Sequence, residues 1–239
     1  MFGTKHLIII AVSICLIIAL TLLTKKMKFK TICKSLFITG IISEIIKVFF
    51  YIIRNEQQYG GILPKTDLPL HLCSIQIIFI AIVCISKNEQ LKRIILSFML
   101  PSCLFGGIAA ILIPASTALN SWVITFQYFI YHIAIVVFAL NIFMNKEIKL
   151  TIKDYLSSIL FLLFMMFVAI YVNSILYDGN PNINFMYVAS PPASGLPFLT
   201  EKYGWFTYIC HYGLLTIFCI TLCYIKPIIN AIKNKKNKD

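Results

Sequence analysis

The chain has 239 residues, of which 59% are hydrophobic and only 13% are charged, and its mean hydropathy is +0.87. These values exclude an ordinary soluble domain and a disordered chain, and they predict a polytopic membrane protein. The formal net charge of +12 does not indicate nucleic-acid binding, because most lysines lie in short segments between apolar runs, where they act as topology signals.

Apolar runs long enough to cross about 30 Å of hydrocarbon, which takes roughly 17–25 helical residues, recur along the chain. They lie near residues 7–23, 32–53, 69–86, 94–113, 122–144, 153–177 and 205–225. We therefore expect an all-α bundle of seven transmembrane helices that forms one domain over residues 1–239. The first run is interpreted as a retained span, because only Lys5 precedes it and no small-residue cleavage site follows it.

Basic residues in the short loops predict the orientation. The segments after the first, third, fifth and seventh runs are rich in lysine, whereas segment 114–121 carries no charge and segments 54–68 and 178–204 carry mixed signs. The sequence thus predicts a multi-pass protein of the cell membrane with its N-terminus outside and its C-terminus in the cytoplasm. Residues 226–239 would form a basic cytoplasmic tail next to anionic lipid.

Segment 178–204 is the only sizeable loop that the runs leave. It combines turn-forming glycines and prolines with an apolar stretch at 185–188. An apolar loop of this length at a membrane surface is expected to pack over the bundle as a lid.

All eight cysteines lie within or at the edge of apolar runs, so no disulfide framework is expected. Cys219 and Cys223 are four residues apart, but no His or acid lies near them, and the sequence predicts no metal site. No Gly-rich phosphate loop is visible either, and no cofactor is expected.

Polar side chains from four runs fall at similar depth in the half of the membrane nearer the predicted outer surface. Because polar groups inside a span face protein or water rather than lipid, they predict a shared pocket that opens outward. Glu44 and Lys47 lie three residues apart on one helix face and are expected to pair with each other or with polar neighbours. The expected pocket residues from the spans are Glu44, Lys47, His71, Cys73, Gln76, Gln127, Tyr128, His132 and His211.

Cys73 is the candidate nucleophile of this pocket, and it needs a lowered pKa or an adjacent base. Pro69 predicts a helix start there with Asp67 or Leu68 as the cap, which places Cys73 just beyond the first turn. On a regular helix His71 and Cys73 point about 200° apart, so His132 is the better general base, with Tyr128 or Gln127 beside it. The alternative is that Cys73 and His132 are only packing residues of the core.

Several short motifs follow one another along residues 40–215. They are Glu44, the segment 68–74 (LPLHLCS), Phe105-Gly106-Gly107 with Pro114, the segment 126–129 (FQYF) followed by His132, and the segment 184–187 (NFMY). In this order the chain resembles the YwaF-like family of bacterial integral membrane proteins. That family is similar to a eukaryotic transmembrane acyltransferase that remodels ether phospholipids through a cysteine.

The resemblance implies roles for individual residues. Cys73 would be the acyl-accepting nucleophile and His132 a catalytic partner, while Asn184 and Tyr187 would line the substrate pocket. The chain departs from the family pattern at Ser190, where a basic residue is expected, so the resemblance implies no phosphate contact from this position of the loop.

The sequence leaves three functions open. The first is a membrane-embedded acyltransferase that passes an acyl group from a phospholipid to a lysophospholipid through Cys73, with His132 or His71 as the base. The second is a proton- or solute-coupled transporter that uses Glu44, Lys47, His132 and His211; its expected inverted repeats are not visible. A seven-helix receptor or retinal protein fits least, because the last run has no mid-membrane lysine. The oligomeric state is left open.

Overall fold

The computed structural model describes residues 3–54, 63–119, 121–144, 150–180, 182–192, 196 and 198–236. Throughout this part of the chain all regular structure is helical. The α-helices are α1 (Thr4–Thr24), α2 (Phe29–Arg54), α4 (Leu72–Ile85), α5 (Glu89–Leu112), α6 (Trp122–Met144), α7 (Ile152–Leu176), α8 (Trp205–Cys223) and α9 (Ile225–Lys236). Short 3-10 helices lie at η1 (Lys65–Asp67), η2 (Ser116–Leu119) and η3 (Phe185–Tyr187).

Six of the described helices are long and apolar enough to cross a membrane: α1, α2, α5, α6, α7 and α8. This confirms the prediction of an all-helical, polytopic membrane protein. The remaining apolar helix, α4, has 14 residues, a length of about 21 Å at 1.5 Å per residue, against about 30 Å of hydrocarbon. The expected tail forms α9 up to residue 236, and residues 237–239 lie outside the described part of the chain.

The start of α4 differs from the prediction. The third apolar run begins at Pro69, but the helix begins at Leu72, and its N-cap is His71 with an extended backbone (φ −68°, ψ 152°). Leu68 precedes a proline, which disfavours helical dihedrals, and its ψ is 148°. The Leu70 N–H then donates to the Leu68 carbonyl oxygen at 2.7 Å, so the chain turns before the helix starts.

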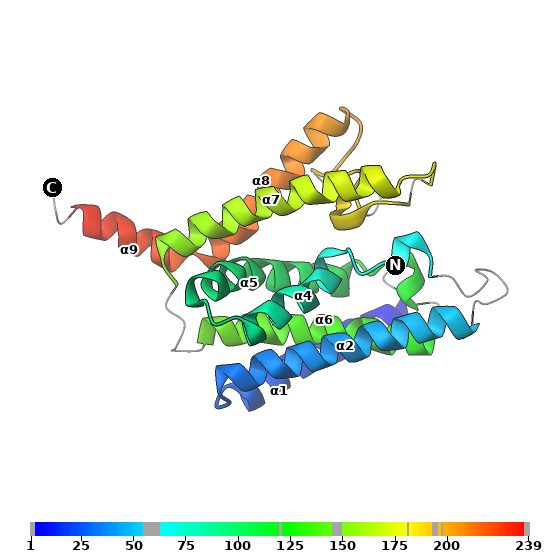
Figure 1. Cartoon of the computed structure of the whole chain (residues 1–239), viewed down its shortest axis with the longest axis horizontal. Helices are drawn as coiled ribbons and strands as arrows, with labels where there is room; N and C mark the ends of the chain where they lie inside the picture. Colours follow the sequence, from blue (N-terminus) through cyan, green and yellow to red (C-terminus); the bar gives the residue numbers. More distant parts are fainter. Residues whose placement is uncertain are drawn as a thin grey trace.

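The helices run back and forth between two ends of the bundle. At one end Lys65, before α4, reaches Asp178, after α7, with an N–O distance of 2.8 Å. At the other end Asn141 of α6 donates to Thr24 of α1 at 2.8 Å. The end with the Lys65–Asp178 contact is called the Cys73 end, and the end with the Asn141–Thr24 contact is called the lysine end. Figure 1 shows α4, α5 and α6 between the α1–α2 pair and the α7–α8 pair.

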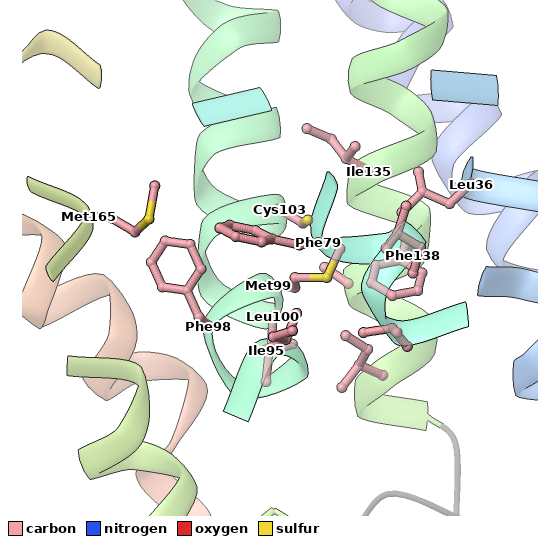
Figure 2. Packing of buried hydrophobic residues seen from close by; sticks show 14 of the residues in the cluster. Leu36, Phe79, Ile95, Phe98, Met99, Leu100, Cys103, Ile135, Phe138 and Met165 are labelled. Carbon is pink, nitrogen blue, oxygen red and sulfur yellow. The ribbon is translucent and has the colours of Figure 1, made fainter. Parts of the chain in front are cut away.

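The core lies where α4, α5 and α6 meet their neighbours. Phe79 of α4, Phe98 of α5 and Phe161 of α7 form a ring cluster with centroids 4.8, 5.3 and 5.9 Å apart. Cys103 is fully buried and lies in the same hydrophobic cluster, near Phe79 and Met99 in Figure 2. Large apolar side chains on the outer faces of the helices are exposed, as expected for a surface in contact with lipid.

Gly40 allows α2 to lie against α4 and α6. A Cβ atom at this position would come within 2.6 Å of the Ile77 side chain and 3.4 Å of the Tyr131 ring. The close contact sets the register of α2 against α4, and one turn farther along α2 Glu44 lies beside Ser74. A glycine in the second helix thus helps to place the first polar residue of the candidate site.

Candidate active site around Cys73

Cys73 is the second residue of α4, so it lies in the first turn of that helix rather than beyond it as expected. The prediction was wrong because the chain turns at residues 68–70 and delays the helix by three residues. The first-turn N–H groups and the helix dipole favour a thiolate at this position. Cys73 itself is partly exposed, and Ser74 follows it in the same turn.

A charged pair lies directly beside this turn. The Ser74 hydroxyl donates to Glu44 Oε1 at 2.8 Å, and Lys47 Nζ lies 2.7 Å from Glu44 Oε2. The exposed fractions are 14% for the Lys47 side chain and 19% for the Glu44 side chain. The predicted pairing of Glu44 with Lys47 is confirmed, and it neutralises two charges that would be costly alone in an apolar surrounding.

Helix α6 contributes a tyrosine and a histidine. The Tyr131 hydroxyl donates to the Cys73 carbonyl oxygen at 2.8 Å and so ties the first turn of α4 to α6. His132 is 3% exposed, and its Nδ1 lies 2.6 Å from the Tyr128 carbonyl oxygen. A carbonyl oxygen only accepts, so Nδ1 carries the proton and the neutral ring keeps Nε2 as a proton acceptor.

Two tyrosine rings of α6 lie close to His132. The Tyr131 ring centroid is 6.0 Å from that of His132, and the Tyr128 ring centroid is 4.1 Å away. The Tyr128 phenol also lies within electrostatic range of the Cys73 sulfur. Within the described residues Cys73 and His132 share no hydrogen bond, so a direct proton transfer requires them to move closer, as catalytic pairs often do when substrate binds.

Close contact between α5 and α6 positions His132. A Cβ atom on Gly107 of α5 would lie 2.5 Å from the Val136 side chain and 3.2 Å from the His132 carbonyl oxygen. No larger residue fits there without a shift of α6, because backbone and packed side chain oppose it. Gly107 is one of the motif residues that the sequence resemblance rests on.

His71 is the N-cap of α4, two residues before Cys73. Its Nε2 lies 3.0 Å from the Thr66 carbonyl oxygen, so Nε2 carries the proton and Nδ1 is the basic nitrogen. Its ring packs against Phe185, with centroids 4.9 Å apart, and against Tyr187, with centroids 6.3 Å apart. The extended backbone at His71 is the distortion that a His71–Cys73 pairing would need, and both histidines remain candidate bases.

The η3 segment covers this end of α4. Met186 and Tyr187 have positive φ angles of 57° and 53°, an uncommon conformation for residues other than glycine. Phe185 and Met186 are buried. Burial raises the pKa of the Tyr187 phenol, and the nearby Cys73 thiol raises it further. The phenol therefore stays protonated beside the thiol and can act as a hydrogen-bond donor.

Side chains from α7 and α8 hold η3 in this conformation. The Asn173 amide donates to the Phe185 carbonyl oxygen at 3.2 Å and accepts from the Phe185 N–H at 2.8 Å. The Tyr212 hydroxyl donates to the Met186 carbonyl oxygen at 2.9 Å, and the Tyr208 hydroxyl donates to the Tyr187 carbonyl oxygen. The covering segment is thus fixed at its centre by four side-chain bonds to the backbone.

Asn184 organises the loop itself. Its side-chain N–H groups donate to the carbonyl oxygen and the hydroxyl of Ser190, both at 2.8 Å, and its Oδ1 accepts from the Ala189 N–H at 3.0 Å. Both N–H groups of the amide are therefore used within the loop. Its partner Ser190 occupies the position where the family pattern has a basic residue.

Of three other predicted pocket residues, Gln76 and Gln127 have partners away from the thiol. Gln76 is fully buried and donates to the Ser102 hydroxyl at 3.0 Å, while its Oε1 has no partner within the described residues. Gln127 donates to the Ser43 hydroxyl at 2.6 Å. His211 lies on α8 with a buried Nδ1 that has no hydrogen-bond partner in the described part of the chain. The Gln127 bond thus joins α6 to α2, the helix that carries Glu44.

Sequence reasoning missed Tyr131 and Asn173, which tie α4 to α6 and η3 to α7. Both are polar side chains inside apolar runs, and that signal could have identified them. Within the described ranges, no group of three or more His, Cys, Asp or Glu side chains comes together to hold a metal ion.

Comparison with protein families matches residues 1–224 to the TMEM164 family. The chain belongs to the TMEM164 family. The match spans every element of the candidate site, from Glu44 on α2 to Tyr212 on α8. As a TMEM164 family protein with six membrane-length helices, it is a multi-pass membrane protein. No curated protein and no solved structure matches the chain.

Proposed function

We propose that this TMEM164 family protein is a phospholipid acyltransferase that works through an acyl thioester on Cys73. The main support is the position of the thiol: it is partly exposed, lies in the first turn of α4 next to Ser74, and is within electrostatic range of the Tyr128 and Tyr187 phenols. Cys103 on α5 is instead fully buried inside the hydrophobic cluster, at whose edge Cys73 lies partly exposed.

The proposed reaction has two transfers. The Cys73 sulfur attacks the ester carbonyl carbon of a phospholipid, and a histidine takes the thiol proton and returns it to the departing lysophospholipid alkoxide. The hydroxyl of an acceptor lysophospholipid then attacks the thioester, and its proton passes through the same histidine back to sulfur. The ester donor needs no energy input and no cofactor.

His132 is the proposed base, with His71 as the alternative. Each has one ring nitrogen held by a backbone carbonyl and the other free to accept a proton. The buried position of His132 and its tilted contact with the Tyr128 ring favour a fixed catalytic role, whereas the His71 ring supports η3. The Tyr187 phenol could donate to the oxyanion of the tetrahedral intermediate.

The membrane supplies the substrates in this proposal. We place the N-terminus outside, the C-terminus in the cytoplasm and seven crossings in the cell membrane, with α4 and the extended residues before it forming the third crossing. The Cys73 end then lies near the outer headgroup level, where a lipid ester can reach the thiol. This orientation can be tested by fusing to the C-terminus a fluorescent protein that folds only in the cytoplasm. Absence of fluorescence would mean that the orientation is the reverse.

A transporter that relays protons through Glu44 and His132 receives no specific support. The Glu44 carboxylate already binds Lys47 and Ser74, and His132 is bonded within its own helix. Both groups thus have local partners in this state of the protein.

Intact-protein mass spectrometry of the chain purified with phospholipid tests the proposal. We expect an added acyl mass that hydroxylamine removes and that peptide mapping assigns to Cys73. An adduct absent from a lipid-saturated sample, or present on Cys210 as much as on Cys73, would contradict a thioester enzyme.

A further inference from the structure

A cavity of about 920 Å³ lies at the lysine end of the bundle, across the protein from Cys73. It is bounded by the start of α2, the end of α4, the start of α5, the end of α6 and the start of α7. None of the candidate acyl-transfer residues lines it. A cavity of this size is in the range of sites for small organic ligands.

The rim of this cavity is strongly basic. Five cationic side chains line it against two acidic ones, Glu89 and Asp154; the cations are Lys30, Lys34, Lys87, Lys92 and Arg93. Lys92 binds Glu89 at 2.7 Å, and Arg93 binds Asp154 through two hydrogen bonds of 2.6 and 2.8 Å. Both carboxylates that line the cavity are therefore already paired with a cation.

Three lysines remain without a carboxylate partner in the described part of the chain: Lys30, Lys34 and Lys87. Two of them come from α2 and one from the segment between α4 and α5. Lys30 and Lys34 of α2 line the same cavity as Lys92 of α5, so cations from two helices border one space. Such converging positive charge favours an anion.

The floor of the cavity is apolar. Phe29, Val83, Leu96 and Ile142 line it, and Val83 and Ile142 are buried. A purely ionic solute would leave this surface uncovered, whereas a phosphate joined to a glycerol and the first methylenes of an acyl chain matches both parts. Basic pockets between transmembrane helices on the cytoplasmic side are known to hold anionic lipid headgroups.

We infer that this cavity binds the phosphate group of an anionic phospholipid from the adjoining leaflet, and that Lys30, Lys34 and Lys87 hold this phosphate. The site is separate from the proposed acyl transfer at the other end of α4. It does not depend on that activity, because its residues and its ligand contacts are different.

Native mass spectrometry of the full chain in a neutral detergent tests this site. The protein is titrated with dioctanoyl phosphatidylglycerol and with dioctanoyl phosphatidylcholine, and we expect at least ~10-fold tighter binding of the anionic lipid. The triple change Lys30→Gln, Lys34→Gln and Lys87→Gln should weaken that binding by about 100-fold, since each lysine near an anionic headgroup contributes a factor of roughly 5. Lys34→Gln alone should weaken it about 5-fold.

The matched control is the triple change Lys25→Gln, Lys26→Gln and Lys28→Gln in the exposed turn between α1 and α2, which removes the same charge but does not line the cavity. It should change the affinity less than about 2-fold. Equal loss in the two triple variants, or equal binding of the two lipids, would overturn the site. Competition by glycerol phosphate identifies the source of the phosphate. If glycerol phosphate displaces the lipid with an affinity equal to that of the lipid, the ligand is a soluble phosphate. If it does not displace the lipid, the ligand is a membrane phospholipid.

Discussion

Ser74 and Glu44 are joined by a 2.8 Å hydrogen bond that connects the first turn of α4 to α2. The bond places the carboxylate, and with it the Glu44–Lys47 ion pair, one residue from the candidate nucleophile Cys73. Ser74 follows Cys73 directly in this turn and lies within electrostatic range of its sulfur. The charge pair of α2 and the thiol of α4 are therefore parts of one connected polar group, and changes in either should affect the other.

Cys73→Ser separates chemistry from packing. The two side chains differ little in volume, so a structural cysteine should tolerate the change with a loss below about 1.5 kcal/mol in the free energy of unfolding. A catalytic thiol should not, because the serine hydroxyl has a far higher pKa. We expect normal folding and at least ~100-fold less acyl transfer, measured with a labelled phospholipid donor.

Cys210→Ser is the control for the thiol, since Cys210 is exposed on α8. Cys103 is less suitable because it is fully buried, and a serine there would bury a hydroxyl without an assured partner. Transfer retained in Cys73→Ser would remove the central residue of the proposed mechanism.

His132→Asn and His71→Asn distinguish the two candidate bases. We expect His132→Asn to lower acyl transfer at least ~100-fold and His71→Asn to lower it less than about 10-fold, the range expected for loss of a general base against loss of a supporting contact. Single-turnover formation of the thioester is the measurement. The reverse order of effects would move the base to His71.

Glu44→Gln isolates the ion pair, because glutamine can still accept the Ser74 hydrogen bond. The change leaves the Lys47 ammonium unpaired, at a cost on the order of 2.5–3.5 kcal/mol for a charge within a membrane. The double change Glu44→Gln with Lys47→Met removes both charges and should recover most of the loss. Thermal unfolding in detergent compares the two, and equal instability would argue that the pair contributes little.

Asn173→Leu tests the anchor of η3. It removes two buried hydrogen bonds to Phe185 and leaves its N–H and carbonyl unpaired, which should cost about 2–4 kcal/mol in the free energy of unfolding. Hydrogen exchange at residues 184–188 should rise at the same time. The neighbouring exposed Ser174 bonds only within its own helix, so Ser174→Ala should change stability by less than about 0.5 kcal/mol.

Asp178 and Lys65 give a pH-dependent contact between the segment before α4 and the loop after α7. The Lys65 hydrogen bond, helped by the Asn180 N–H, lowers the pKa of the Asp178 carboxyl. A lowered pKa in the folded state means that the contribution to stability is present above the usual aspartate pKa of about 3.9 and is lost as the pH falls through the folded-state value.

We therefore expect Asp178→Asn to lower the unfolding temperature slightly and by the same amount from pH 8 to about pH 5, with the difference from the wild type disappearing in strong acid. The effect is small because both side chains are about half exposed. A difference that grew on acidification would have the wrong sign for this pair.

The apolar runs by themselves determined the membrane class and the approximate position of nearly every long helix. Transfer of apolar side chains from water to lipid depends on local sequence and adds along the chain, so the run near 122–144 matches α6 (Trp122–Met144). The depth of Glu44 and Lys47 and their shared helix face likewise follow from spacing along one helix, and their pairing could be predicted.

Only the tertiary structure decided which way each polar side chain turns. A span that is apolar on all sides has no periodicity that marks its buried face, so the sequence could not direct Gln76 to Ser102 or Gln127 to Ser43. The late start of α4 depends on the turn at Leu68, and the fixed position of η3 depends on Asn173 from another helix. These contacts join residues distant in sequence, and only close packing of the helices brings them together.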